Sequence, residues 1–74
     1  MNTYEPLNRS ANGRYSIGNV ELTSGDLIEW LNDDMATIGR VEHSDPIGYC
    51  VNAGNDYIPL SELITARYIG SGRL

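Results

Sequence analysis

The side chains of this sequence that could do chemistry gather around its one His and its one Cys. Glu42 and Asp45 flank His43, and such a group could hold a metal ion or transfer a proton. A metal site needs a second cluster of ligands, and the sequence offers none with suitable spacing. A solvated turn is therefore the simpler interpretation of these three residues, and we predict no metal site and no cofactor.

Cys50 could act as a nucleophile with His43 as its base, but the sequence shows no third orienting group and no oxyanion device. The more common role of a free Cys is that of a small buried hydrophobe in a strand. A single Cys also excludes an internal disulfide and suits a reducing compartment. We therefore predict a protein that is not an enzyme.

The charge balance bears on the kind of partner. Ten Asp and Glu residues face five basic residues, all of them Arg, which gives a formal net charge of −5. Direct binding of nucleic acid normally leaves a basic footprint, so we expect none. Five of the acidic residues fall around two neighbouring predicted hairpins: Glu29, Asp33, Asp34, Glu42 and Asp45. They either imitate a row of phosphates or keep a sheet edge soluble.

Large aromatic and Arg side chains are the residue types that dominate binding hot spots. The sequence has no Phe, so several of its aromatic residues are needed in the core, and Tyr68 is one candidate. Apolar residues alternate on both faces of 27–31, which leaves Trp30 either in the core or on a partner surface. The predicted partner-binding residues are Trp30, Arg40, Tyr49, Tyr57 and Arg67, together with the acidic Glu29, Asp33 and Asp34.

The stretch 21–42 organises the elements that carry these residues. Ser24 could cap a helix, but that helix would end at Asp33 and Asp34, beside the negative end of its own dipole. A turn at 24–26 followed by a strand over 27–31 fits better, with a tight hairpin at 32–34 and a second strand over 36–43. Gly39 then marks a bulge or a close contact.

Further short strands are predicted over 14–17, 20–22, 47–51, 57–60 and 65–69, with a Gly18-Asn19 turn joining the first two. Pro59 restricts its strand to an edge, and 61–63 is predicted as one 3₁₀ turn before the last strand. Five or six short strands of this kind indicate an all-β, SH3-like barrel over 13–69. Residues 1–12 are predicted to form a flexible arm and residues 70–74 a frayed tail.

The succession NGRYSI, ELTSGDLIEWL, IGRVEH, GYCV, IPLSEL and ARYI resembles a family of small bacterial proteins of unknown function with SH3-like barrels. Those proteins are often encoded on phages and conjugative elements. The resemblance spans 12–69 and is strongest at 22–29 and 39–43. Met35 departs from it, because the family commonly has a Trp shortly before the Arg-hydrophobic-Glu run. The resemblance implies a fold and a genomic setting, but no activity and no functional residues.

These observations favour a small acidic binding module that acts through a protein partner, encoded by a bacterial phage or mobile element. An acidic inhibitor of host defence or of nucleic-acid machinery, similar to anti-CRISPR proteins, is the alternative, and a direct nucleic-acid binder ranks third. No apolar run approaches the roughly 20 residues of a membrane span, and no signal segment opens the chain. We therefore expect a cytoplasmic protein that makes no contact with membranes.

Overall fold

A central hairpin organises the molecule, whose structure is a computed structural model that describes residues 3–71. Strands β5 (Asp26–Asn32) and β6 (Met35–Ser44) pair in antiparallel register from Leu27 opposite Arg40 to Asn32 opposite Met35. The predicted strand at 27–31 is thus confirmed. Strands are the only regular elements over residues 3–71, which confirms the all-β class, and this range contains no helix suited to crossing a membrane.

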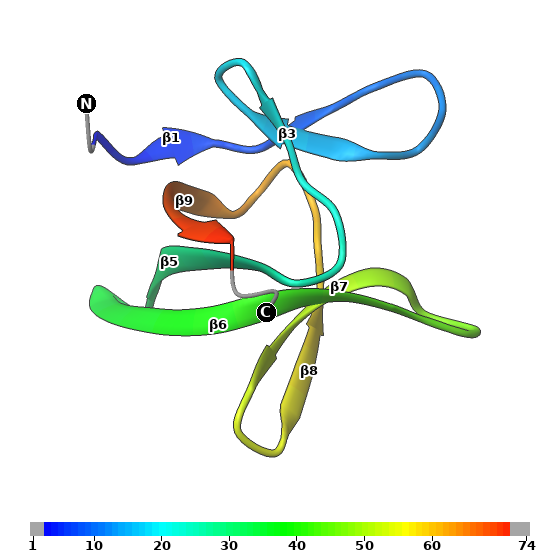
Figure 1. Cartoon of the computed structure of the whole chain (residues 1–74). Helices are drawn as coiled ribbons and strands as arrows, with labels where there is room; N and C mark the ends of the chain where they lie inside the picture. Colours follow the sequence, from blue (N-terminus) through cyan, green and yellow to red (C-terminus); the bar gives the residue numbers. More distant parts are fainter. Residues whose placement is uncertain (1–2, 72–74) are drawn as a thin grey trace.

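The strands form two antiparallel sheets (Figure 1). The larger sheet places the central hairpin between strands from both ends of the chain, in the order β1 (Glu5–Pro6), β9 (Thr65–Ser71), β5, β6, β7 (Gly48–Ala53) and β8 (Asp56–Pro59). The smaller sheet contains β2 (Asn8–Arg9), β3 (Tyr15–Ile17) and β4 (Val20–Glu21). As Pro59 requires, β8 is an edge strand.

The N-terminal segment differs from the predicted flexible arm. Leu7 is only 1% exposed, and its backbone N–H donates to the Ile64 carbonyl oxygen at 2.9 Å. The chain passes from one sheet to the other at this residue, because Glu5–Pro6 pairs with β9 and Asn8–Arg9 pairs with β3. At the other end, Gly70 and Ser71 belong to β9, and the rest of the predicted tail lies outside the described residues.

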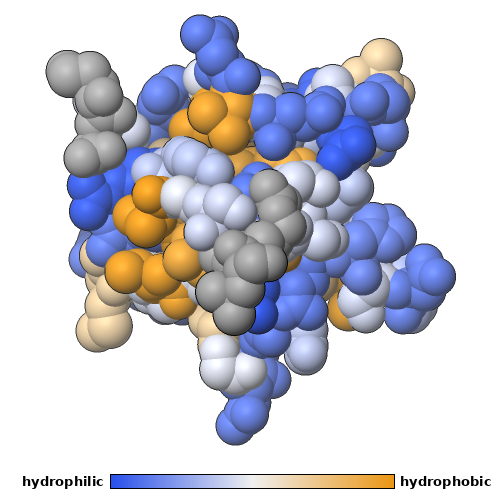
Figure 2. Space-filling view, viewed as in Figure 1, coloured by the Kyte–Doolittle hydropathy of each residue, from blue (hydrophilic) through white to orange (hydrophobic). Residues whose placement is uncertain are grey.

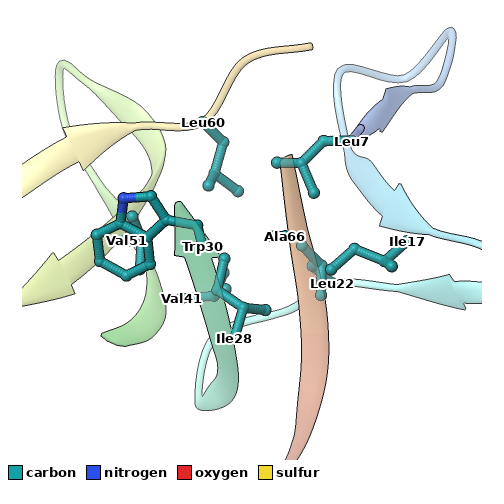
Figure 3. Packing of buried hydrophobic residues seen from close by; sticks show 9 residues of the cluster. All are labelled: Leu7, Ile17, Leu22, Ile28, Trp30, Val41, Val51, Leu60 and Ala66. Atoms are coloured by element: carbon teal, nitrogen blue, oxygen red, sulfur yellow. The ribbon is translucent and has the colours of Figure 1, made fainter. Parts of the chain in front are cut away.

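The core fills the space between the two sheets. Ile28 and Trp30 point inward from β5, and side chains from the small sheet and the connecting segments meet them (Figure 3). The buried cluster consists of Leu7, Ile17, Leu22, Ile28, Trp30, Val41, Val51, Leu60 and Ala66. It draws on both sheets, so each sheet needs the other in order to bury its apolar face.

Two tight turns have clear local causes. Asp33 and Asp34 both adopt positive φ, 51° and 65°, which is the geometry of a type I′ turn between β5 and β6. Before β9, the Ile64 N–H donates to the Ser61 carbonyl oxygen at 3.1 Å. This single i→i+3 hydrogen bond across 61–63 confirms the predicted 3₁₀ turn before the last strand.

Gly39 marks a close contact and not a bulge. Its pairing with Ile28 is regular, and a Cβ atom there would lie 2.7 Å from the Asn52 carbonyl oxygen. The irregularity in the sheet lies on the other side of β5, where the partners of Leu27 and Ile28 are Gly70 and Tyr68. Ile69 is the additional residue at that step.

Candidate functional site

The outer side of the large sheet exposes large apolar side chains. Because Ile28 and Trp30 point inward, their neighbours Leu27, Glu29 and Leu31 point outward. Ile38 lies opposite Glu29 on this side, and Ile69 lies at the bulge beside Leu27. We call Leu27, Leu31, Ile38 and Ile69 the outer apolar face.

Three of the four residues of the outer apolar face are exposed to solvent, and Leu27 is half-buried. Ile38 is 57% exposed, Ile69 43% and Leu31 42%, and they lie on three adjacent strands. Figure 2 shows apolar surface gathered on the left, over β5, β6 and β9. Single exposed apolar residues are ordinary on protein surfaces, but a contiguous group on one sheet face is typical of an interaction site.

A shallow depression of about 360 Å³ adjoins the outer apolar face. Leu27 and Ile38 line it on one side, and Arg40, Glu42 and Asn52 provide a polar margin. The Asn52 amide nitrogen donates to Glu42 Oε2 at 3.0 Å, while the buried Asn52 Oδ1 has no hydrogen-bond partner within the described chain. The face therefore combines apolar side chains with oriented polar groups, which lie at its margin and, at Glu29, between Leu27 and Leu31.

Glu29 and Arg67, two of the predicted binding residues, form an ion pair with each other. Arg67 Nε donates to Glu29 Oε1 at 2.5 Å, and the Tyr4 hydroxyl donates to the same oxygen at 2.8 Å. The Arg67 guanidinium also lies over the Tyr4 ring, 5.5 Å from its centroid. The hydrogen bond from Tyr4 and then that from Arg67 lower the pKa of Glu29, and the hydrogen bond to Glu29 raises the pKa of Tyr4. This network joins the N-terminal segment to β5 and β9.

The three aromatic residues predicted to bind a partner lie in three different environments in the structure. Trp30 is only 3% exposed and belongs to the core, which corrects its placement on a partner surface. Tyr49 packs against the core and meets the His43 ring edge-on, with ring centroids 4.8 Å apart. Tyr57 alone is largely exposed, on the edge strand β8.

The acidic residues do not form one cluster. Asp33 and Asp34 precede β6, whereas Asp45 follows it, so a strand of roughly 30 Å in extended length separates them. Glu29 and Glu42 are engaged by Arg67 and Asn52. The predicted phosphate-like row is therefore reduced to one exposed acidic tip, formed by Asp33 and Asp34.

Arg40 and Arg67 both face outward, but β5 separates them. Arg40 lies opposite Leu27, and Arg67 lies opposite Glu29 with its charge engaged there. Arg40 is exposed and forms no ion pair with any residue between 3 and 71. The two predicted Arg residues therefore do not form a shared cationic surface.

His43 and Cys50 are not arranged for catalysis. Cys50 lies opposite Glu42, while His43 lies opposite Tyr49, so the two side chains project from opposite faces of the sheet. Cys50 is fully buried, and burial followed by the nearby Glu42 carboxylate raises the pKa of its thiol, which disfavours the thiolate. In residues 3–71, no three His, Cys, Asp or Glu side chains are grouped so as to hold a metal ion.

Sequence reasoning missed Leu31, Ile38 and Ile69 as surface residues. A usable signal exists, because Gly39 and Ala66 are small residues that lie on the same side of the sheet as Trp30 and leave room for its ring. That side is therefore the core side, and Leu31 must point away from it.

In comparisons with known proteins, no family model, no curated protein and no solved structure matches this chain.

Proposed function

We propose that this protein is a non-enzymatic, acidic binding module with an SH3-like fold, and that it acts by docking the outer apolar face onto a partner protein. The exposure of Leu31, Ile38 and Ile69 on three adjacent strands carries this proposal. Covering such a face removes apolar area from water, which is the main driving force for association. Leu31, Ile38 and Ile69 are three of the seven large apolar side chains that are exposed in the described part of the chain.

The charge near the face indicates the chemistry of the partner. Asp33 and Asp34 form an exposed acidic tip at the end of the hairpin that carries Leu31 and Ile38. The whole chain has a net charge of −5, so its field attracts basic surfaces. The partner proposed here is therefore a protein surface with an apolar centre and Lys or Arg residues where it meets the tip.

Several features support the SH3-like assignment. The first strand pairs with the last, short antiparallel strands form two sheets around one core, and a single turn at 61–63 precedes the final strand. The resemblance of 12–69 to small bacterial proteins supports a role as an accessory protein of a phage or mobile element, acting in the cytoplasm.

Inhibition of a nucleic-acid-binding host protein by acidic mimicry is the second candidate, and the acidic tip at Asp33 and Asp34 favours it. Mimicry depends on charge, so binding would weaken steeply as salt rises. Docking by the outer apolar face depends on apolar burial and changes little with salt.

The test compares three immobilised proteins in a bacterial lysate: the wild type, a face variant with Leu31→Thr and Ile38→Thr, and the control Leu63→Thr. Leu63 is 94% exposed in the turn before β9, so the control removes an exposed apolar side chain outside the face. Thr keeps the strand propensity of the replaced positions. Thermal unfolding of all three proteins confirms that each remains folded.

We expect a protein that the wild type and the Leu63→Thr control retain at 0.1 and 0.5 M salt and that the face variant loses. The retained protein should carry a basic patch. In purified form it should bind the wild type and the Leu63→Thr control with similar affinity, and the face variant more weakly. Identical retention by all three baits would contradict the proposal. Loss of the protein from the wild type at 0.5 M salt, together with its retention by the face variant at 0.1 M salt, would instead establish mimicry. A concentration-dependent dimer of the chain alone would make a second copy the occupant.

A further inference from the structure

A second site lies between the two sheets, away from the outer apolar face. This inter-sheet pocket has a volume of about 300 Å³ and is lined by Arg9, Asn12, Tyr15, His43, Tyr49 and Leu60, among others. Figure 1 shows the β2–β3 loop and the β6–β7 turn, which contribute to it, on the same side of the molecule. None of its nine lining residues is acidic, although the chain has ten Asp and Glu against five Arg.

The ring of Tyr49, which lines the inter-sheet pocket, makes contacts with two neighbouring side chains. Tyr49 meets the His43 ring edge-on at an interplanar angle of 78°, and the Arg14 guanidinium lies over the Tyr49 ring, 5.4 Å from its centroid. Arg14 Nε lies 3.7 Å from Glu21 Oε1, an ion-pair contact too long for a hydrogen bond. Arg14 thus supports the Tyr49 ring and has its charge partly offset by Glu21.

The remaining polar groups supply hydrogen-bond donors. Asn12 Oδ1 accepts from the Arg14 backbone N–H at 3.0 Å and from the Ser10 hydroxyl, which leaves the Asn12 Nδ2 group as a donor. Arg9, opposite Tyr15 on the neighbouring strand, is exposed and has no ion pair in the described part of the chain. The His43 imidazole and the two Tyr hydroxyls add donors to this set.

We propose that the inter-sheet pocket binds a carboxylate presented by a peptide, either a Glu side chain or a C-terminal carboxylate. Arg9 is the charged partner of the carboxylate, and His43 and Asn12 supply further N–H donors. Leu60 and the ring of Tyr15 receive the aliphatic part of the same residue. The site is at the lower end of the size range of ligand pockets, so it accommodates one residue and not a nucleotide.

The charge of the molecule favours a carboxylate over a phosphate group. Arg9 is the one fully available cation of the inter-sheet pocket, and the net charge of −5 repels a dianion more strongly than a monoanion. The outer apolar face lies on the opposite side of the large sheet from His43 and Tyr49, so this site is independent of the proposed function. Failure of either proposal leaves the other unaffected.

The test is a titration of the ¹⁵N-labelled full chain, followed by amide chemical shifts, with four small probes. N-acetyl-leucine and N-acetyl-glutamic acid α-amide each present one carboxylate, N-acetyl-leucine amide presents none, and inorganic phosphate presents a dianion. Arg9→Gln removes the proposed charge, and Arg40→Gln is the matched control, since Arg40 is also an exposed Arg in a strand but lies on the outer side of the sheet.

We expect saturable shifts at 12–13, 43 and 47–49 with at least one carboxylate probe, and a dissociation constant of about 1 mM, which suits a contact of single-residue size. Arg9→Gln should weaken binding about tenfold, the usual effect of one charge-assisted hydrogen bond, and Arg40→Gln should leave it unchanged. Shifts that do not saturate, equal binding of the amide probe, equal losses in both Arg variants, or tighter binding of phosphate would each overturn the proposal.

Discussion

The indole ring of Trp30 lies directly over Gly39 on the neighbouring strand, so closely that a Cβ atom at Gly39 would come within 2.9 Å of Trp30 Cζ3. Val51 Cγ2 and the Asn52 carbonyl oxygen would lie equally close to it, at 2.8 and 2.7 Å. The core therefore packs directly against the backbone of Gly39 and leaves no space for a side chain there. Because one of the three atoms is backbone, rotamer changes alone cannot make room.

Gly39→Ala should therefore destabilise the protein by about 2–3 kcal/mol, the cost of overpacking a well-filled core. Gly54→Ala is the control. Gly54 has φ of 69°, but a Cβ atom at this position would have no neighbour within 4 Å, so the variant carries backbone strain without a steric clash. Its cost should be about 1 kcal/mol. In thermal unfolding, equal shifts for the two variants would show that the Gly39 contact is not tight.

The Tyr4–Glu29–Arg67 network should stabilise the fold only in the middle of the pH range. Its hydrogen bonds lower the pKa of Glu29, so this contribution is present above the unfolded value of about 4.3 and is lost as the pH falls through the lowered pKa. The hydrogen bond to Glu29 raises the pKa of Tyr4, so that contribution is present below about 10 and is lost as the pH rises through the raised pKa.

Urea unfolding of the wild type and Glu29→Gln at a series of pH values measures this network. We expect the wild type to be more stable near pH 7 and the difference to shrink below about pH 4 and above about pH 10. Tyr4→Phe should abolish the alkaline part of the effect and also reduce the acidic part, because the hydrogen bond from Tyr4 is the first cause of the lowered pKa of Glu29. A stability difference that stays constant from pH 3 to pH 11 would show that packing, and not charge, is responsible.

The central hairpin could be predicted from sequence because its causes are local. Gly25 with φ of 99° and the pair Asp33–Asp34 set its ends, and alternating apolar residues fill its strands. The N-terminal segment could not be predicted, because its structure depends on partners roughly sixty residues away. Leu7 is ordered by a hydrogen bond to Ile64, and the two-residue strand at Glu5 has no signal of its own.

The same distinction between local causes and distant partners applies to the residues of the candidate site. Arg40 and Asp33–Asp34 are correctly placed on the surface by their polarity, whereas Trp30, predicted among the partner-binding residues, lies in the core. Periodicity indicates two apolar faces on β5 and offers no means of choosing between them. The choice depends on Gly39 and Ala66, which lie on β6 and β9, on either side of β5, and make room for the ring. Their small size is visible in the sequence, but their place beside Trp30 follows only from the strand register.

Cys50 should behave as a structural thiol. It is fully buried and its pKa is raised, so a thiol-specific reagent should label it slowly in the native protein and quickly in denaturant. Cys50→Ala should cost about 1 kcal/mol of stability, through lost apolar burial and a small cavity. Rapid labelling of the native protein at neutral pH would contradict this assignment and reopen the question of a reactive thiol.

Nucleic acid should not bind. Of the Arg residues in the described part of the chain, Arg14 and Arg67 are paired with Glu21 and Glu29, and Arg9 and Arg40 lie on different sides of the molecule. Contact with about one phosphate at a time gives weak, salt-sensitive association. Micromolar protein should therefore cause no mobility shift of duplex DNA or single-stranded RNA at physiological salt. A tight complex that Arg40→Ala abolishes would contradict the protein-partner proposal.

The acidic tip formed by Asp33 and Asp34 should lower the free energy of unfolding of the protein. Both residues of its type I′ turn have positive φ, where Asn followed by Gly is strongly preferred, and two adjacent carboxylates repel each other. The double variant Asp33→Asn, Asp34→Gly should therefore be more stable than the wild type by about 1 kcal/mol. For a domain of this size, the melting temperature should rise by roughly 4–8 °C.

The same double variant should bind the basic partner of the proposed function more weakly, because it removes the charge complementary to that partner. Gain of stability with loss of affinity would mean that the acidic tip serves recognition at the expense of folding. Asp45→Asn is the control: it removes an exposed carboxylate from the turn at the opposite end of β6 and should change neither quantity appreciably. If the double variant is more stable and binds as tightly as the wild type, the tip has no part in recognition, and apolar contacts alone carry the interface.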